Sequence, residues 1–255
     1  MPPRDSRKIG LARALSKLGY CSRSQAAALI RAGRVRLNGN VRRDPESPVR
    51  VERDRIVVDG GAVASQAKIY LTMNKPRGLV TTASDEKGRE TVCSILKAAD
   101  SLPWVAPVGR LDRASEGLLL LTNDSEWGAR IAAPESHIEK TYHVQIGSVA
   151  GEKVAAALAS GMRTKGGEFM RAVRASPLRA GEKNCWLEIT LDEGKNRQIR
   201  RMLESLGVEV LRLIRVAIGP LQLGKLQKGA YRHLSAEEKL ALDRAIGTKT
   251  ELAGT

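Results

Sequence analysis

One carboxylate stands at the entrance to the most leucine-rich stretch of the chain. Asp112 lies six residues ahead of the four leucines at 118–121, in the segment VGRLDRASEGLLLLTND at 108–124. A short apolar run bounded by polar residues is typical of a buried strand. A charge at the edge of such a strand is costly unless another group pairs with it or a reaction uses it. The segment predicts a buried strand preceded by a carboxylate that either opens a turn or carries chemistry.

The charge balance favours a polyanionic partner. The chain has 43 lysines and arginines against 28 acidic residues, a formal net charge of +15 and a pI of about 10.1. The first 60 residues hold 14 of the basic and 6 of the acidic residues, so they carry +8 of this surplus. Such a field attracts nucleic acids and speeds their encounter. A membrane surface is the alternative, but no basic amphipathic anchor helix is evident.

Length and cysteine usage predict a cytoplasmic protein with one medium and one small domain. At 255 residues, of which 42% are hydrophobic, the chain can form packed cores. Its apolar runs are far shorter than the ~20 residues of a membrane span, and its first residues do not resemble a signal peptide. Three widely spaced cysteines indicate reduced thiols without a disulfide framework. They form no zinc-binding pattern with the three histidines, so we expect no metal.

The N-terminal part predicts a small α/β unit over 8–59. Leucines at helical spacing indicate a first helix that ends at Gly19, and Ser22 with Gln25 predicts a capping box on a second helix. An alternating strand over 34–37 is followed by Asn38-Gly39, which is a hairpin turn signal. We expect a second strand pair, formed by 49–51 and 56–58.

Basic side chains dominate the polar faces of this unit. Residues 7–43 lack acidic side chains, and arginine suits phosphate because its planar fork donates two hydrogen bonds at once. The order LxxxLSKLGYCSRSQAAALIRAGRVRLNG resembles the small RNA-binding domain of ribosomal protein S4. We therefore expect the following residues to contact RNA: Arg7, Lys8, Arg13, Lys17, Arg23, Arg31, Arg34 and Arg36.

Four further segments, in order, resemble one enzyme family. They are KPRGLVT at 75–81, GRLDRASEGLLLLTND at 109–124, KTYHV at 140–144 and EGKNRQIRRM at 193–202. Together with a closing segment at 229–234, they resemble the pseudouridine synthases that modify bacterial ribosomal RNA at a single site. The resemblance covers nearly the whole chain. It implies a catalytic domain over 69–246. The small, polar residues at 60–68 predict a linker before it, and we expect a flexible tail at 247–255.

The resemblance assigns roles to particular residues. It implies that Asp112 is the catalytic residue, supported by Arg110, Tyr142, Arg200 and Leu213. Tyr142 would lie against the target base, on which an aromatic ring can stack; Leu213 would form an apolar wall under it. Arg200 would pair with the Asp112 carboxylate. Three basic residues of these motifs are expected to contact RNA: Lys75, Arg197 and Arg201.

The family implies an α+β fold: a small N-terminal α/β domain, then a mixed, largely antiparallel sheet with helices packed outside and the active cleft between its halves. Converting uridine to pseudouridine adds and removes no atoms, and no nucleotide-binding fingerprint is present, so we expect no cofactor. Glycoside hydrolysis fits less well because it usually needs two placed carboxylates; Glu116 lies four residues from Asp112, but the motif gives it no such role.

The expected substrate is large-subunit ribosomal RNA, either as free RNA or within a pre-ribosomal particle. We expect the enzyme to be a monomer. Two alternatives remain. One is a synthase that acts on transfer RNA. The other is a non-catalytic RNA-binding factor for ribosome assembly that keeps the same fold. Whether Asp112 attacks the anomeric carbon or removes a sugar proton is open at this point.

Overall fold

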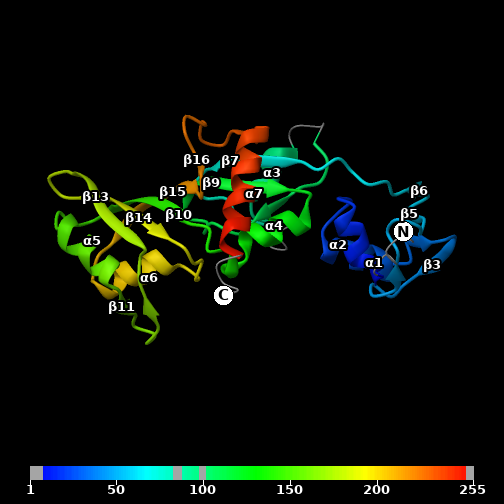
Figure 1. Ribbon diagram of the computed structural model, residues 1–255, viewed down its shortest axis with the longest axis horizontal. Coiled ribbons are helices and arrows are strands. Elements are labelled where there is room, and N and C mark those ends of the chain that lie inside the picture. Colours follow the sequence, from blue (N-terminus) through cyan, green and yellow to red (C-terminus); the bar gives the residue numbers. More distant parts are fainter. Residues whose placement is uncertain (1–7, 83–87, 98–101, 251–255) are drawn as a thin grey trace.

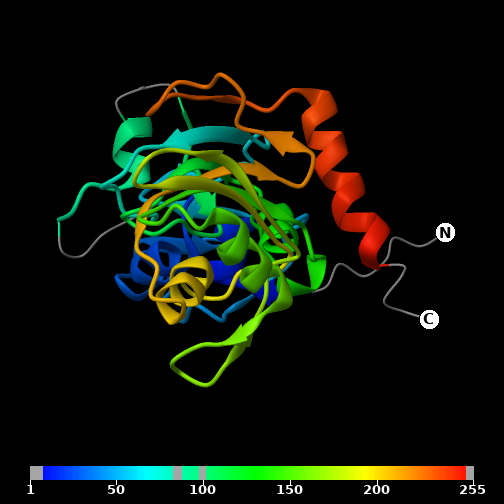
Figure 2. The same cartoon turned by 90° about the vertical axis from the view of Figure 1, so that its left-hand side faces the viewer.

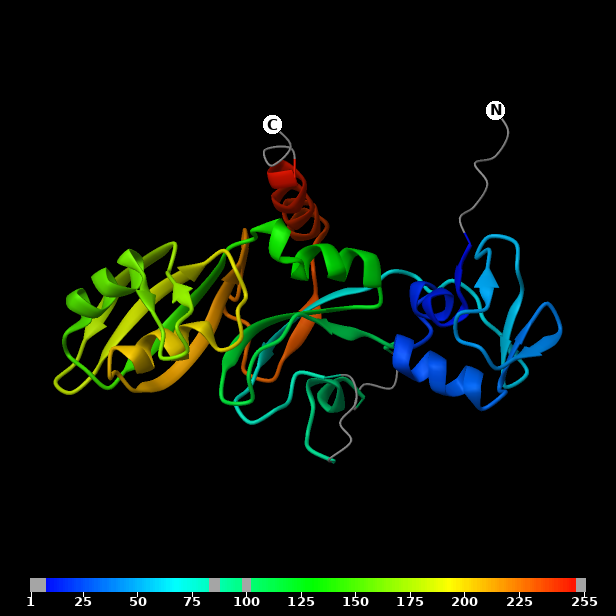
Figure 3. The same ribbon diagram turned by 90° about the horizontal axis from the view of Figure 1, so that it is seen from below.

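The computed structural model describes residues 8–82, 88–97 and 102–250. Figures 1 and 3 show three parts in a row: an N-terminal domain, a central half and a distal half, of which the last two share one sheet. Each part has its own hydrophobic core, and the central half has one on each face of its sheet. In these described residues, no helix is long and apolar enough to cross a membrane.

The N-terminal domain packs two helices against short strands. Its core contains the apolar face of both helices and the inward side chains of β2 and β5. The Ser22 hydroxyl accepts from Gln25 N at 3.1 Å and the Gln25 side chain accepts from Ser22 N at 3.0 Å, so the predicted capping box is confirmed. The elements are β1 (Ile9–Gly10), α1 (Leu11–Lys17), α2 (Arg23–Arg31), β2 (Val35–Leu37), β3 (Asn40–Arg42), β4 (Pro48–Val49), β5 (Ile56–Val58) and β6 (Gly61–Ala62).

The second strand pair expected here is wrong. β4 pairs with β1, and β5 pairs with β2, with Val58 opposite Val35. Between β4 and β5 the chain makes a turn in which the Asp54 carboxylate accepts from Arg50 N at 2.7 Å. This turn directs β5 to the open edge of β2, where Ile56 and Val58 reach the core.

The rest of the chain forms a nine-stranded sheet. Its strand order is β13-β14-β10-β15-β9-β7-β17, with β16 beside β15 and β8 beside β9. Every neighbouring pair is antiparallel except β15 with β9, so the expected mixed, largely antiparallel sheet is confirmed. The strands are β7 (Tyr70–Lys75), β8 (Ala106–Val108), β9 (Glu116–Thr122), β10 (Lys140–Ile146), β13 (Arg174–Ala180), β14 (Cys185–Leu191), β15 (Val210–Ile218), β16 (Leu221–Gln222) and β17 (Tyr231–His233).

The central half is covered on both faces. All seven residues of β9 are buried. Leu119 and Leu121 face a core that includes α3 (Val92–Lys97), and Leu118 and Leu120 face a core that includes α4 (Ser125–Ala132) and α7 (Ala236–Thr250). A strand covered on both sides needs a continuous apolar run, which explains the four leucines. The short 3-10 helix η1 (Pro134–Ser136) then leads into β10.

The distal half is covered on one face. α5 (Gly151–Ser160) and α6 (Gln198–Ser205) pack their apolar sides on the inward residues of β10, β14 and β15. The opposite face carries polar residues such as His143, Glu188 and Thr190. The β11 (Met162–Arg163) and β12 (Phe169–Met170) hairpin extends away from this half (Figure 2).

The two halves join where β9 runs parallel to β15. Gly117 lies opposite Arg215 with a φ of +103°, and a Cβ there would clash with the Arg215 carbonyl oxygen, so this approach requires glycine. Next to it the buried Glu116 carboxylate binds Arg212 at 3.2 Å and Lys228 at 2.6 Å. Burial opposes ionisation of Glu116, but hydrogen bonds from Lys228 and Arg212 outweigh it and hold its pKa below the usual value.

Two of the expected segment boundaries differ from the structure. β6 lies inside the expected linker and pairs with β5. α7 begins with the capping box of Ser235 and Glu238 and continues to Thr250, so the first four residues of the expected tail are helical. Asn123, at the end of β9, holds the remaining linker by bonds to Ile69 N and the Ala67 carbonyl, both 2.8 Å.

Candidate active site

A pocket of about 220 Å³ lies at the junction of the two halves. Its walls come from the loop before β9, the start of β10, the start of α6 and the middle of β15. Most site residues expected from the sequence line it: Arg110, Asp112, Tyr142, Arg197, Arg200 and Leu213. Residues distant in sequence are thus brought together by the parallel pairing of β9 and β15.

The loop that carries Asp112 is fixed from the segment after β7. Lys75 Nζ donates to the carbonyl oxygens of Pro76 at 3.1 Å, Asp112 at 3.2 Å and Ser115 at 2.8 Å. The Thr81 hydroxyl donates to the Leu111 carbonyl at 2.6 Å and accepts from Leu111 N. The backbone on both sides of Asp112 is therefore held in place, while about a third of the Asp112 side chain stays exposed.

Lys75 is a correction to the sequence prediction. Expected on the RNA-binding surface, its side chain is fully buried, with 0% exposure. Burial lowers its pKa to about 8, because a desolvated ammonium is disfavoured; Glu116 and Asp112 act in the opposite direction. The residue acts on the backbone of the Asp112 loop and has no surface from which to contact a phosphate.

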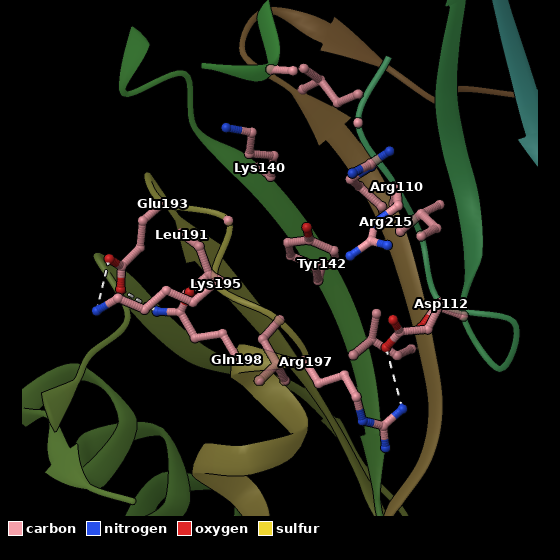
Figure 4. A pocket seen from close by; sticks show the side chains of 18 of the residues that line it. Arg110, Asp112, Lys140, Tyr142, Leu191, Glu193, Lys195, Arg197, Gln198 and Arg215 are labelled. Carbon is pink, nitrogen blue, oxygen red and sulfur yellow. Dashed lines mark hydrogen bonds and ion pairs between the residues drawn. The ribbon is translucent and has the colours of Figure 1, made fainter. Parts of the chain in front are cut away.

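The ion pair to Asp112 comes from a different arginine than expected. Arg197 Nη1 lies 3.5 Å from Asp112 Oδ2 (Figure 4). Arg200 instead donates to the Ala114 carbonyl at 3.2 Å, and its buried Nε has no hydrogen-bond partner in the described residues. Burial and the positive charge of Arg197 lower the pKa of Arg200, and Asp112 partly compensates. Arg200 therefore supports the same loop through its backbone.

The backbone at Arg197 explains this exchange of partners. Arg197 precedes α6 with a φ of +51° and a ψ of +32°, the left-handed conformation. That conformation is uncommon for a residue other than glycine, and such strained positions concentrate at functional sites. Arg197 is exposed and reaches Asp112, whereas Arg200, in the first turn of α6, is partly buried and reaches the Ala114 carbonyl.

Tyr142 stands at the boundary between the two cores. It is half-buried and packs against both the distal core and the α3-side core. On β10 it lies opposite Arg215, two residues along β15 from the buried Leu213, which also lines the pocket. Arg110 is exposed and also lines the pocket (Figure 4).

Arg215 is a pocket residue that the sequence prediction missed. Its side chain is 5% exposed, and its Nε donates to the Leu118 carbonyl at 2.7 Å. A signal was available: side chains alternate along a strand, so a residue two positions after the predicted Leu213 wall faces the same way.

The pocket has a second carboxylate at its opposite side. Glu193 accepts from Gln198 Nε2 at 2.6 Å and pairs with Lys195 at 3.1 Å (Figure 4). Both of its oxygens are therefore engaged. Glu116, the other acidic residue near Asp112 in sequence, is buried in its own ion pairs and does not line the pocket.

Of the other residues expected to contact RNA, some are held by hydrogen bonds or ion pairs within the protein and some are exposed without an ion pair. Arg201 binds Glu168 at 3.0 Å and Thr164 at 3.3 Å, so it lies against the β11–β12 hairpin. Arg34 makes a two-pronged pair with Asp59, and Lys17 pairs with Glu126 of α4. Arg36 donates to the Gly39 carbonyl.

The remaining basic residues of this domain are exposed, and in the described residues no acidic group lies in ion-pair distance of them: Lys8, Arg13, Arg23 and Arg31. Arg7 lies outside the described residues.

Comparisons with known proteins agree with this architecture. Residues 69–205 match the RNA pseudouridylate synthase family, and residues 9–56 match the S4 domain. An uncharacterized RNA pseudouridine synthase of Aquifex aeolicus is 39% identical over 236 residues, covering 92% of this chain and 94% of that protein. The ribosomal large subunit pseudouridine synthase B of Bacillus subtilis is 35% identical, covering 89% and 93%.

The structural comparison points the same way. A crystal structure of a pseudouridylate synthase superimposes with a TM-score of 0.63 at 30% identity, covering 92% of this chain and 99% of that one. The chain therefore belongs to the RNA pseudouridine synthases, isomerases that convert uridine to pseudouridine in RNA, and it carries an S4 domain before its catalytic domain.

Proposed function

We propose that this enzyme isomerises a uridine of large-subunit ribosomal RNA with Asp112 as its catalytic carboxylate. The observation that carries the assignment of Asp112 is its position. It is fixed through the backbone at the junction of the two halves, in the same pocket as Tyr142, and its pair with Arg197 is partly exposed. Glu193, the other carboxylate in the pocket wall, is held by Gln198 and Lys195.

The chemistry requires the target base to leave its helix. Uracil is detached from the sugar, turned and rejoined through C5, so the nucleotide must enter a pocket, and an aromatic side chain can hold it by stacking. Tyr142 supplies this ring, and Leu213 closes the pocket from the adjacent strand. Asp112 then reacts at the sugar, and its ion pair with Arg197 orients the carboxylate.

The ribosomal substrate rests on three observations. The Bacillus subtilis relative is named for the large ribosomal subunit. The N-terminal S4 domain carries exposed arginines, and the chain as a whole is strongly basic. The N-terminal domain lies at one end of the row of three parts (Figure 1), so its arginines can hold RNA outside the modified nucleotide.

Mapping pseudouridines in ribosomal and transfer RNA of cells with and without the gene tests this proposal. One position in large-subunit ribosomal RNA should lose its modification when the gene is deleted. The wild-type gene should restore it, and the Asp112→Asn gene should not. Loss of a transfer RNA modification instead would refute the ribosomal substrate. Restoration by the Asp112→Asn gene would refute the catalytic assignment.

A further inference from the structure

Arg215 is a buried cation whose hydrogen-bonding capacity is mostly unused. Its Nε is bound to the Leu118 carbonyl, but neither terminal nitrogen has a hydrogen-bond partner in the described residues, and Nη2 is completely buried. No carboxylate of the described residues lies in ion-pair distance of it. A buried guanidinium without a partner is strongly unfavourable. Because Nη2 has no exposed surface, Nη1 is the donor from which a ligand in the pocket can accept.

The position of Arg215 identifies the part of the substrate that it meets. It lines the pocket at the level of Tyr142, its cross-strand neighbour, and its guanidinium points toward the tyrosine ring (Figure 4). Asp112 and Arg197 occupy a different part of the wall. RNA phosphates are held at the surface, whereas a side chain that is 5% exposed can meet only what enters the pocket. The group beside a stacking tyrosine is the base.

We propose that Arg215 donates hydrogen bonds to a carbonyl oxygen of the target uracil and stabilises the base as it leaves the sugar. This inference rests on the proposed placement of the base against Tyr142. When the C1′–N1 bond breaks, its electron pair stays on the base, and the charge spreads over N1, O2 and O4. A fixed donor aimed at charge that develops in the transition state is among the largest sources of rate enhancement.

The remaining steps balance without a co-reactant. Asp112 meets the sugar, either by bonding to C1′ or by taking the C2′ proton. C5 of the turned base then bonds to C1′ as the carboxylate is released or the C2′ proton is returned. The base loses its C5 proton and gains one at N1. The positive charge of Arg215 contributes to the lowered pKa of Lys75, so the two cations lie close together.

The fixed Nε is what makes Arg215 suitable for this work. Its bond to Leu118 ties the guanidinium to β9, the strand that follows the Asp112 loop. The Arg215 donor and the Asp112 carboxylate are thereby held by β9 and the loop that precedes it. The base can rotate while both groups stay in place. A purely structural arginine would use its terminal nitrogens on protein acceptors.

The test compares Arg215→Met, Arg215→Lys and the wild type on a large-subunit ribosomal RNA transcript carrying tritium at C5 of uridine. Single-turnover tritium release should fall about 10²–10³-fold in Arg215→Met, the effect of losing one such donor. Arg215→Lys should retain more activity. RNA affinity should stay within about twofold, since the effect is on the chemical step. Arg174→Met, an exposed arginine of the same sheet paired with Glu139, is the control and should match the wild type.

Thio-substituted transcripts separate a hydrogen-bond donor from a structural role. Sulfur is a poorer acceptor than oxygen, so 2-thiouridine or 4-thiouridine at the contacted position should slow the wild type at least tenfold more than Arg215→Met. The proposal would be overturned if, with sulfur at either position, the wild type and Arg215→Met were slowed equally. It would also be overturned if the activity of Arg215→Met lay within threefold of that of the wild type. If Arg215→Met does not fold, Arg215→Lys is compared instead: it keeps a displaced donor, so sulfur substitution should slow it less than the wild type, and an equal slowing of the two proteins would overturn the proposal. A wild type active on transfer RNA but not on this transcript would refute the ribosomal substrate, and the Arg215 comparison would then use transfer RNA.

Discussion

Three basic residues that hold the pocket wall and the unpaired basic residues of the N-terminal domain have opposite environments. Lys75, Arg200 and Arg215 are buried or half-buried, and each donates to backbone carbonyl oxygens of the 112–118 region. Arg13 and Arg23, by contrast, project from the surface of the N-terminal domain. The same residue types thus serve two purposes, one by fixing a loop and one by presenting charge.

This difference predicts how each region responds to mutation. A buried cation that holds several backbone groups cannot be replaced by its neighbours, so its loss moves the reacting groups. Exposed cations act through a shared electrostatic field, so each one contributes a small, similar share. Substitutions in the pocket should therefore change turnover, and substitutions in the N-terminal domain should change affinity and its salt dependence.

The largest effect is expected at the residue that the pocket cations position. Asp112→Asn keeps the size of the side chain and removes its charge, so turnover should fall by about 10⁴-fold or more, as when a catalytic carboxylate is neutralised. RNA affinity and the melting temperature should change little, because Asp112 is partly exposed and its pair with Arg197 is long. Single-turnover kinetics, filter binding and thermal unfolding measure the three quantities.

Glu193→Gln is the matched control for Asp112→Asn, since it neutralises the other carboxylate of the pocket wall. Its loss should lower turnover less than about tenfold, the scale of a positioning effect rather than a chemical one. A larger loss in Glu193→Gln than in Asp112→Asn would show that the reacting carboxylate has been misassigned.

Lys75→Met should have the next largest effect. It leaves the carbonyls of Asp112 and Ser115 without their donor. Turnover should fall about 10²-fold, since a displacement of the Asp112 loop by ~1 Å is enough for such a loss. The free energy of unfolding should fall by ~1–3 kcal/mol because the carbonyl oxygens lose their donor. Lys68→Met is the control: this exposed lysine also donates to a carbonyl, that of Lys17, and should change stability by less than ~0.5 kcal/mol.

The pH dependence gives Lys75 a second signature. With a folded pKa of about 8 against ~10.4 in the unfolded chain, the residue is neutral in the fold and charged in the unfolded chain between these values. Its contribution to the free energy of unfolding therefore rises as pH increases through this window. Turnover should fall over the same range, because a neutral amine has two N–H groups for three carbonyls. Lys75→Met should lack both changes; their persistence in this variant would assign them to another group.

Arg197 and Arg200 should separate turnover from stability. Arg197→Ala removes the ion pair to Asp112 and should lower turnover about 10²-fold, yet change stability by less than ~1 kcal/mol because the pair is half-exposed. Arg200→Ala removes the donor to Ala114 and should lower the free energy of unfolding by about 1–3 kcal/mol. Denaturant unfolding and single-turnover rates of both variants test this. A greater stability loss in Arg197→Ala would reverse the two roles.

Local features of the fold were predictable from the sequence because they depend on near neighbours. The capping boxes at Ser22 and Ser235 involve residues three positions apart. The strand over 140–146 follows from alternation, and the buried β9 follows from its leucines. The motifs also brought Asp112, Tyr142 and Leu213 into one pocket, as the family resemblance implied.

Features that depend on distant contacts were not predictable in the same way. Lys75 looks like any surface lysine beside a turn, and its burial follows only from the carbonyls of a loop 37 to 40 residues away. The choice between Arg197 and Arg200 depends on one left-handed backbone position. The pairing of β5 with β2 was missed because the turn at Asp54 redirects the chain.

The smallest single effects are expected on the N-terminal surface. Arg13→Ala, Arg23→Ala and Arg31→Ala should each weaken RNA binding a few-fold, because each removes at most one phosphate contact and leaves the surrounding field. The slope of log affinity against log salt should decrease by ~0.7–0.9 per lost contact. Turnover at saturating RNA should stay at the wild-type value, since these side chains lie far from the pocket. Filter binding over a salt series, together with single-turnover rates, measures both.

The variant that combines the three alanine substitutions, and a variant of the ion-paired Arg34, complete this comparison. If the contacts are independent, the triple variant should show about three times the slope change of a single variant. Arg34→Ala should change the slope less, because Asp59 already neutralises Arg34 through two hydrogen bonds of 2.8 and 2.6 Å. Loss of Arg34 also leaves Asp59 unpaired, which adds a negative charge to the surface and lowers affinity by repulsion rather than by a lost contact. A full slope change in Arg34→Ala would mean that RNA displaces Asp59. An unchanged slope in the triple variant would mean that the N-terminal domain does not present its charge to RNA.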